Sequence, residues 1–166
     1  IEVKTIDAYP CNGEGVLCQE LTNSIKQGIK TIIGIGSNKK RHELYNKLRL
    51  ENINYASVIH PTAIIDKKAY IGKGCFIGAG TYIGPDVYIG DHCIINTSAI
   101  IEHDSTIKSF THIGPNATCC GYSYVHKLCF VGASATITSN LTLGLGCTLG
   151  AGAVMLRDHI NEVGAT

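Results

Sequence analysis

An aliphatic residue recurs at every sixth position from Ile59 to Met155, without a slip in phase. A helix would need apolar residues every three to four positions, and an isolated strand would need alternation over a short run. A strict period of six instead predicts a short extended segment and a turn, repeated many times. A fixed short period with frequent Gly is typical of a hexapeptide β-helix, in which three segments close one triangular coil. The residues of this aliphatic column are Ile59, Ile65, Ile71, Ile77, Ile83, Ile89, Ile95, Ile101, Ile107, Ile113, Cys119, Val125, Val131, Ile137, Leu143, Leu149 and Met155.

A second column, of mostly small residues such as Ala63 and Ala99, lies four positions after each aliphatic residue. We expect the aliphatic residues to point into the prism at its corners and the small residues to lie on its inner wall. Stacked coils should lie about 4.8 Å apart, as neighbouring strands do. One coil cannot bury its core face alone, so the repeat has to run over several coils.

Half of the 8 cysteines fall in the small column, where buried reduced Cys behaves as a small hydrophobe. No CxxC pair suggests a zinc site. We therefore predict reduced structural thiols, no metal, and a cytoplasmic protein, since disulfides are rare in that compartment. The four cysteines are Cys75, Cys93, Cys129 and Cys147.

Composition excludes several function classes. A net charge of +1 gives no electrostatic case for nucleic-acid binding, and no Lys/Arg run marks a membrane surface. No apolar run reaches the length of a membrane span. Because the chain begins at Ile1 rather than Met, we expect its natural N-terminus to lie upstream.

The first 58 residues lack the repeat and alternate between strand and helix patterns, which is typical of an α/β unit. We predict a truncated Rossmann-like acceptor-binding domain over 1–58, a β-helix over 59–156 and a polar tail over 157–166. The strand, Gly-rich turn and helix that open a nucleotide-binding fold are absent, and Gly34 and Gly36 also fit an ordinary strand–helix turn. The expected elements are strand Ile1–Asp7, helix Gln19–Gln27, strand Lys30–Gly36, helix Lys39–Leu50 after a Ser37-Asn38 cap, and strand Tyr55–Val58.

The repeat turns polar around His103, which lies between Glu102 and Asp104. A carboxylate beside a histidine orients the ring and raises its basicity, so this pair fits a general base. The same residues also fit an ordinary polar turn on the outer face. The other histidines of the repeat, His112 excepted, are interpreted as structural or surface residues: His60, His92, His126 and His159.

His112 and Gly121 are the next candidates. His112 follows His103 by half a coil, so the two lie on different sides of one prism and can cooperate only between subunits. Gly121 falls one coil beyond His103, where its N–H could stabilise an oxyanion. A surface histidine and an ordinary turn glycine remain the alternatives. A covalent route through Cys119 or Cys120 is disfavoured, because one of them belongs to the core column.

Four segments carry a resemblance over nearly the whole chain: Ile32–Leu48 (IIGIGSNKKRHELYNKL), Val58–Ala63 (VIHPTA), Ile95–Ile107 (INTSAIIEHDSTI) and Phe110–Thr118 (FTHIGPNAT). With the hexads, the chain resembles the bacterial left-handed β-helix sugar acetyltransferases. The subgroup it is most similar to is the sialic-acid O-acetyltransferase-like family, which includes PglD-type nucleotide-sugar 4-amino N-acetyltransferases. The resemblance implies a left-handed helix and a homotrimer, with acetyl-CoA bound between adjacent prisms.

The resemblance also implies roles for individual residues. His103 matches the general base, Gly121 the oxyanion donor, and Asp104 the carboxylate beside the base, where the family has Glu. The positions that match contacts to acetyl-CoA are His112, Ala133 and Ala151, and those that match the nucleotide-sugar site are Asp7 and Gly36.

We therefore predict direct acetyl transfer from acetyl-CoA to the 4-amino group of a nucleotide-linked amino-deoxy sugar, in bacterial glycan biosynthesis. O-acetylation of sialic acid or another glycan hydroxyl is the alternative. Zinc-dependent carbonic anhydrase chemistry is disfavoured, because no two His are five residues apart. A β-helical scaffold without activity would leave the His103–Asp104 pair unexplained.

Overall fold

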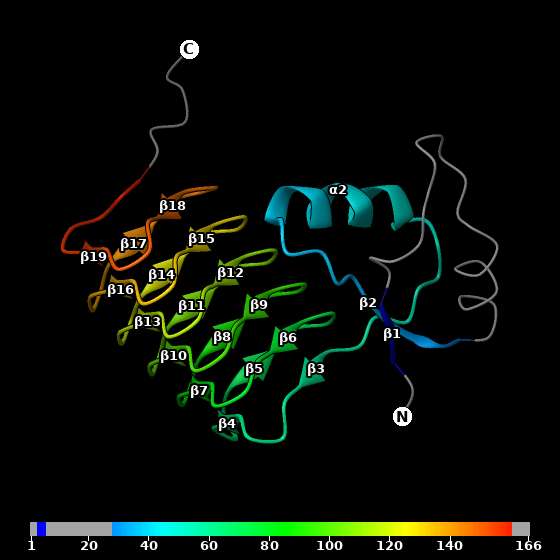
Figure 1. Cartoon of the computed structure of the whole chain (residues 1–166), viewed down its shortest axis with the longest axis horizontal. Helices are drawn as coiled ribbons and strands as arrows, with labels where there is room; N and C mark the ends of the chain where they lie inside the picture. The colour runs from blue at the N-terminus through cyan, green and yellow to red at the C-terminus, as the bar shows by residue number, and fades with distance from the viewer. Residues whose placement is uncertain (1–2, 6–27, 161–166) are drawn as a thin grey trace, which may run out of the picture.

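The computed structural model describes residues 3–5 and 28–160, and from Val58 onward the chain winds into stacked triangular coils (Figure 1). Each side of a coil is one short strand, and a turn joins it to the next side. The strands are β3 (Val58–Ile59), β4 (Ile64–Ile65), β5 (Tyr70–Ile71), β6 (Phe76–Ile77), β7 (Tyr82–Ile83), β8 (Tyr88–Ile89), β9 (Ile94–Ile95), β10 (Ile100–Ile101), β11 (Thr106–Ile107), β12 (His112–Ile113), β13 (Thr118–Cys119), β14 (Tyr124–Val125), β15 (Phe130–Val131), β16 (Thr136–Ile137), β17 (Thr142–Leu143), β18 (Thr148–Leu149) and β19 (Val154–Met155).

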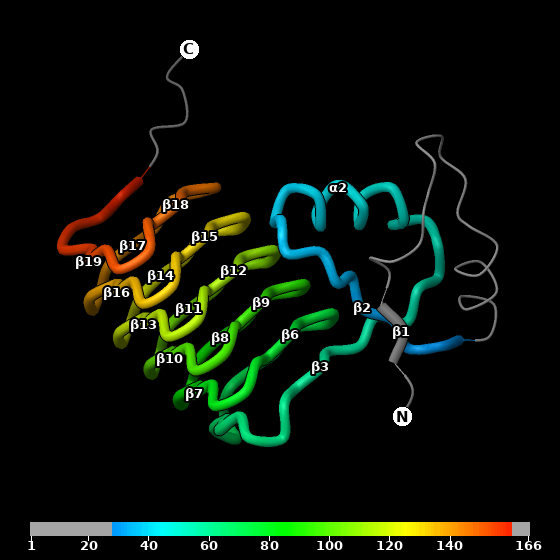
Figure 2. Tube along the Cα trace, in the orientation of Figure 1, coloured from blue at the N-terminus to red at the C-terminus, as the bar shows by residue number. Residues whose placement is uncertain are grey.

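The strands collect into three parallel sheets, which we call walls. The first wall has the order β18-β15-β12-β9-β6-β3, the second β19-β16-β13-β10-β7-β4, and the third β17-β14-β11-β8-β5. Each strand inside a wall pairs with the strand one coil before and one coil after, so Ile101 lies between Ile83 and Cys119. The tube in Figure 2 shows these coils stacked in register. The predicted parallel β-helix is confirmed.

The aliphatic column fills the prism, and the small column lies beside it on the inner wall as predicted. Ile77, Ile101 and Ile137 have no exposed surface, and neither do Cys75 and Ala99. Burying a side chain of this size contributes about 1.5–3 kcal/mol. The core is thus a continuous column that no single coil could bury alone.

The corners of the prism differ from the prediction. The aliphatic residues lie in the strands that form the flat walls, not at the corners. Each corner is a two-residue turn, such as His103-Asp104, and from Gly74 onward the second residue of the turn has a positive φ. That angle is 58° at Asp104 and 61° at Phe110. Non-glycine residues rarely adopt this conformation, and here a hydrogen bond such as that from Asp104 N to Pro85 O (3.0 Å) holds it.

The region before the β-helix is α/β, as far as it is described. Strand β1 (Val3–Thr5) pairs in parallel with β2 (Lys30–Ile32), and helix α2 (Asn38–Leu48) follows, with the Ser37 hydroxyl accepting from Lys40 N at its start. The predicted strand Lys30–Gly36 already ends at Ile32, and the predicted helix Lys39–Leu50 ends at Leu48. The predicted helix Gln19–Gln27 lies outside the described residues.

The predicted strand Tyr55–Val58 is wrong as a single element. Tyr55 forms a parallel bridge with Thr31 and so extends the sheet of β1 and β2. Val58 already belongs to β3 and pairs with Phe76 of the β-helix. The segment splits because each end finds a different backbone partner.

Helix α2 lies against the β-helix (Figure 1) and is fixed there by Arg41. This side chain is 1% exposed. Its guanidinium donates to His92 O (2.8 Å), Phe110 O (3.1 Å) and Ile35 O (2.7 Å), and to Asn38 Oδ1 (2.8 Å). Burial lowers the pKa of Arg41 to about 10, which leaves it charged at neutral pH. The arginine therefore joins the α/β region to two coils of the β-helix.

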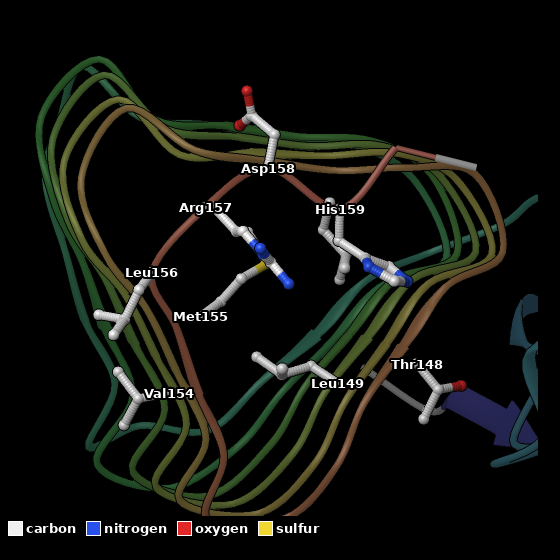
Figure 3. A pocket seen from close by; sticks show the side chains of 9 residues that line it. Thr148, Leu149, Val154, Met155, Leu156, Arg157, Asp158 and His159 are labelled. Carbon is white, nitrogen blue, oxygen red and sulfur yellow. The ribbon is translucent and has the colours of Figure 1, made fainter. Parts of the chain in front are cut away.

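The last coil leaves the end of the prism open. Figure 3 looks into this opening, where Leu149 and Met155 line a cavity of about 340 Å³ beneath the segment that carries Arg157. Part of the predicted polar tail, 157–160, crosses the end, and His159 bridges Leu143 of β17. Within the described ranges, no helix is long and apolar enough to cross a membrane.

Candidate active site

His103 and Asp104 form the turn that joins β10 to β11, between the second and third walls. Nδ1 of His103 lies 2.9 Å from Oδ2 of Asp104. The side chains are 49% and 39% exposed, so both can reach a reactant outside the prism. The short Asp104 side chain thus reaches the ring directly. Because Nδ1 is occupied by the carboxylate, Nε2 is the ring nitrogen left to exchange a proton.

Gly121 lies directly beside that free nitrogen, one coil further along. A Cβ at Gly121 would lie 2.7 Å from both Cε1 and Nε2 of His103, so any side chain would displace the ring. The coils are held in this register by Tyr122 N, which donates to His103 O (3.1 Å). Among the described residues, nothing accepts a hydrogen bond from the Gly121 N–H. The predicted neighbourhood of His103 and Gly121 is therefore present.

His112 and Gly36 line a second candidate feature, a cavity of about 370 Å³ between the segment after β2 and the first wall. Nε2 of His112 lies 3.2 Å from Nδ2 of Asn96 on the same wall. Burial, and then the charge of Arg41, lower the pKa of His112 below its ordinary value. The ring is therefore neutral at neutral pH and can take part in a hydrogen bond with a bound molecule.

Ala133 and Ala151 stack at the corner between the first and second walls, after β15 and β18. Both are exposed. The coils approach so closely there that a Cβ at Gly132 would lie 2.4 Å from Ala151 N. This corner is not the one that carries His103, and His112 lies on the first wall. Within one chain the candidate acetyl-CoA residues and the candidate base are thus on different sides of the prism.

Of the remaining candidates, Asp7 lies outside the described residues. The described part of the chain, 3–5 and 28–160, holds no group of three His, Cys, Asp or Glu that could bind a metal ion. The six cysteines in those ranges are free, and five of them are buried. Burial raises the pKa of the Cys119 thiol to about 12, so it is a poor nucleophile.

Sequence reasoning missed two residues that shape this region, Arg41 and Asn96. Arg41 falls on the inward face of α2 with Leu44 and Leu48, and that spacing was its only signal. Asn96 opens the polar stretch that leads to His103, but its hydrogen bond to His112 depends on how neighbouring coils stack.

Comparison with known proteins matches the β-helix to two family profiles. Residues 68–103 match the bacterial transferase hexapeptide family (six repeats), and residues 127–157 match the hexapeptide repeat of succinyl-transferase. Both matches lie within the coils described above.

Among solved structures, the chain is similar to PerB from Caulobacter crescentus in complex with CoA and GDP-perosamine. The two are 33% identical with a TM-score of 0.82, over 86% of this chain and 70% of that one. The chain belongs to the PglD-type sugar N-acetyltransferases of the hexapeptide β-helix class. A histidine-to-asparagine variant of the Caulobacter perosamine N-acetyltransferase, also with CoA and GDP-perosamine, matches at 32% identity and a TM-score of 0.79, over 83% of this chain and 66% of that one.

A second member of this class is the acetyltransferase domain of PglB from Neisseria gonorrhoeae FA1090 in complex with acetyl coenzyme A. It is 28% identical with a TM-score of 0.80, over 86% of this chain and 70% of that one. The chain thus spans about two thirds of the length of these relatives.

Proposed function

We propose that this chain is an acetyl-CoA-dependent N-acetyltransferase that acts on the 4-amino group of a nucleotide-linked amino-deoxy sugar. The observation that carries the proposal is the His103–Asp104 pair with Gly121 beside the free ring nitrogen. A base, a carboxylate that orients it and an adjacent N–H are the groups that direct acyl transfer requires. Membership of the family supplies the donor and the class of acceptor.

In the proposed mechanism, Nε2 of His103 removes a proton from the acceptor amine as its nitrogen attacks the thioester carbon of acetyl-CoA. The negative charge that develops on the carbonyl oxygen is stabilised by the Gly121 N–H. The C–S bond then breaks, the acetyl group stays on nitrogen, and the CoA thiolate takes the proton from His103. Asp104 stabilises the imidazolium while it carries that proton.

We further infer a homotrimer with left-handed coils and active sites between prisms. The separation of His103 from His112, Ala133 and Ala151 within one chain supports it, because a second prism could bring the two sets together. On this arrangement, residues 59–156 form the acyltransferase domain, and acetyl-CoA contacts His112, Ala133 and Ala151.

Residues 1–58 are proposed to be the acceptor-binding domain, with Asp7 and Gly36 at the nucleotide sugar. The cavity that Gly36 shares with His112 supports this role. Free thiols suit a reducing compartment, so we infer a cytoplasmic enzyme.

The acceptor is proposed to be an amine because both Caulobacter relatives were solved with GDP-perosamine and one of them is named perosamine N-acetyltransferase. The test is thiol release from acetyl-CoA by the full chain with UDP- and GDP-linked 4-amino sugars, and with sialic acid. We expect release with an amino sugar, and a loss of about two to four orders of magnitude in His103→Ala. Release with sialic acid alone would move the protein to O-acetylation. A lack of release with every acceptor, together with no binding of acetyl-CoA by calorimetry, would overturn the proposal.

A further inference from the structure

The peptide group between Cys120 and Gly121 is held in an unusual way. The Cys120 carbonyl accepts from the Ser105 hydroxyl (3.1 Å) and from the Ser123 hydroxyl, and also from Ser123 N (3.2 Å). Both serines are buried, at 0% and 1% exposure. Within residues 3–5 and 28–160, no other carbonyl accepts from two side-chain hydroxyls.

Both serines belong to the small column inside the prism, directly beneath the turns that carry the candidate site. Ser105 follows Asp104, and its hydroxyl also accepts from Ser123 N (3.3 Å). Ser105 Oγ further lies 3.5 Å from His103 O. One buried side chain therefore contacts both the turn of His103 and the turn of Gly121.

Hydroxyls elsewhere in this column provide a comparison. The Thr111 hydroxyl donates to His126 O of the next coil (2.9 Å). The Thr81 hydroxyl donates to Gly78 O and Asn96 O. In each case the carbonyl accepts from a single hydroxyl. Convergence of two hydroxyls on one peptide oxygen is thus particular to the coil of Gly121.

The geometry of a peptide bond connects this oxygen to the candidate site. A trans peptide is planar, and its C=O and N–H point in opposite directions. Fixing the Cys120 oxygen from inside the prism therefore fixes the Gly121 N–H on the outer side, where His103 lies. Hydrogen bonds to a carbonyl also polarise the amide, which strengthens its N–H as a donor.

We propose that Ser105 and Ser123 are positioning residues that orient and polarise the Gly121 N–H for the developing oxyanion. The proposal rests on the proposed acetyl transfer and adds to it a role for two hydroxyl groups inside the core. Neither serine touches a reactant, so the pair acts on the transition state only through the Cys120–Gly121 amide.

The kinetic test compares Ser105→Ala, Ser123→Ala and the double variant with wild type. Loss of a whole oxyanion donor costs about 10²–10³ in kcat, so we expect a loss of about three- to tenfold per serine and up to about a hundredfold for both. The KM for acetyl-CoA should not change. Ser105→Thr should restore kcat, because this column already holds Thr at Thr81 and Thr111.

Thr111→Val is the matched control, since it removes a buried hydroxyl from the same column beneath a different corner. It should keep the kcat of wild type. If the double alanine variant does not fold, Ser105→Cys preserves the volume with a weaker donor, as at Cys75 and Cys93, and should also lower kcat. Wild-type kcat in the serine variants, or an equal loss in Thr111→Val, would overturn the proposal.

A readout independent of activity separates this proposal from the proposed function. The amide NMR signal of Gly121 should move in Ser105→Ala and Ser123→Ala, and stay in place in Thr111→Val. An unmoved Gly121 signal in both serine variants would overturn the positioning role. A wild-type protein without transfer, in which the Gly121 signal still responds to the serines, would instead overturn the acetyltransferase assignment and support the amide geometry.

Discussion

Two histidines at corners of the same prism, His92 and His103, have opposite surroundings. His92 is 2% exposed, stacked on Phe110 at 5.0 Å and covered by Tyr45 and Tyr55 at 4.8 and 4.6 Å. Burial lowers its pKa to about 4, and its Nδ1 has no partner within the described ranges.

His103 is held by Asp104 and has about half of its side chain exposed. Both turns have a positive φ at their second residue, which is His92 in one turn and Asp104 in the other, so His103 is the first residue of its turn. The two turns also differ in what covers them. Helix α2 and Arg41 close the corner of His92, whereas among the described residues His103 has only the edge of the Tyr122 ring beside it, at 5.3 Å, and keeps half of its side chain exposed. A corner of the β-helix that another part of the protein covers is therefore structural, whereas an exposed corner is available for chemistry.

Among the variants that test this contrast between the two corners, we expect the largest effect on kcat from Gly121→Ala. The new Cβ would lie 2.7 Å from the His103 ring, which must swing away from its present position. We expect kcat to fall by about 10²–10⁴, as when a general base is displaced from its reactant. Binding of acetyl-CoA, measured by calorimetry, should persist. A variant with wild-type kcat would show that the contact between Gly121 and His103 is not used.

A smaller effect concerns the covered histidine and pH. The pKa of His92 is about 4 when folded, against an ordinary value of 6.5, so the unfolded state binds the proton more readily. Its contribution to stability is complete above pH 6.5 and is lost as pH falls towards 4, by about 3 kcal/mol in total. Urea unfolding at pH 7 and pH 4.5 should show this loss in wild type and much less of it in His92→Phe. Equal pH dependence in the two proteins would contradict the assignment.

The smallest effect is expected from Asp104→Asn. Asn tolerates the positive φ of this position and keeps the size of the side chain, but it removes the charge that stabilises the imidazolium. We expect kcat/KM to fall by about tenfold, with thermal unfolding unchanged. An unchanged pH–rate profile at full activity would mean that Asp104 only shapes the turn.

The sequence predicted the β-helix well because a period of six imposes one wall strand per repeat, and stacking then aligns like residues. It also predicted that Gly121 would lie beside His103, since equivalent positions recur after one full coil. The aliphatic residues were wrongly predicted at the corners because the period alone does not say which residues of a hexad form the turn and which form the strand.

The cover of His92 was less accessible from the sequence. It depends on Arg41 of α2, whose guanidinium donates to the carbonyl groups of residues 92 and 110. These residues lie on two neighbouring coils of the β-helix, far from α2 in the sequence. Local patterns carry no information on how two units dock. For the same reason the hydrogen bond between Asn96 and His112 became visible only in the folded chain.

The most direct test of the account is acetyl transfer to a GDP-linked 4-amino sugar by wild type, His103→Ala and His92→Phe, assayed in parallel at neutral pH as thiol release. We expect His103→Ala to lose about two to four orders of magnitude in turnover. His92→Phe, which stays folded at this pH, should keep wild-type turnover. Full activity in His103→Ala, or an equal loss in both variants, would contradict the claim that the open corner carries the chemistry.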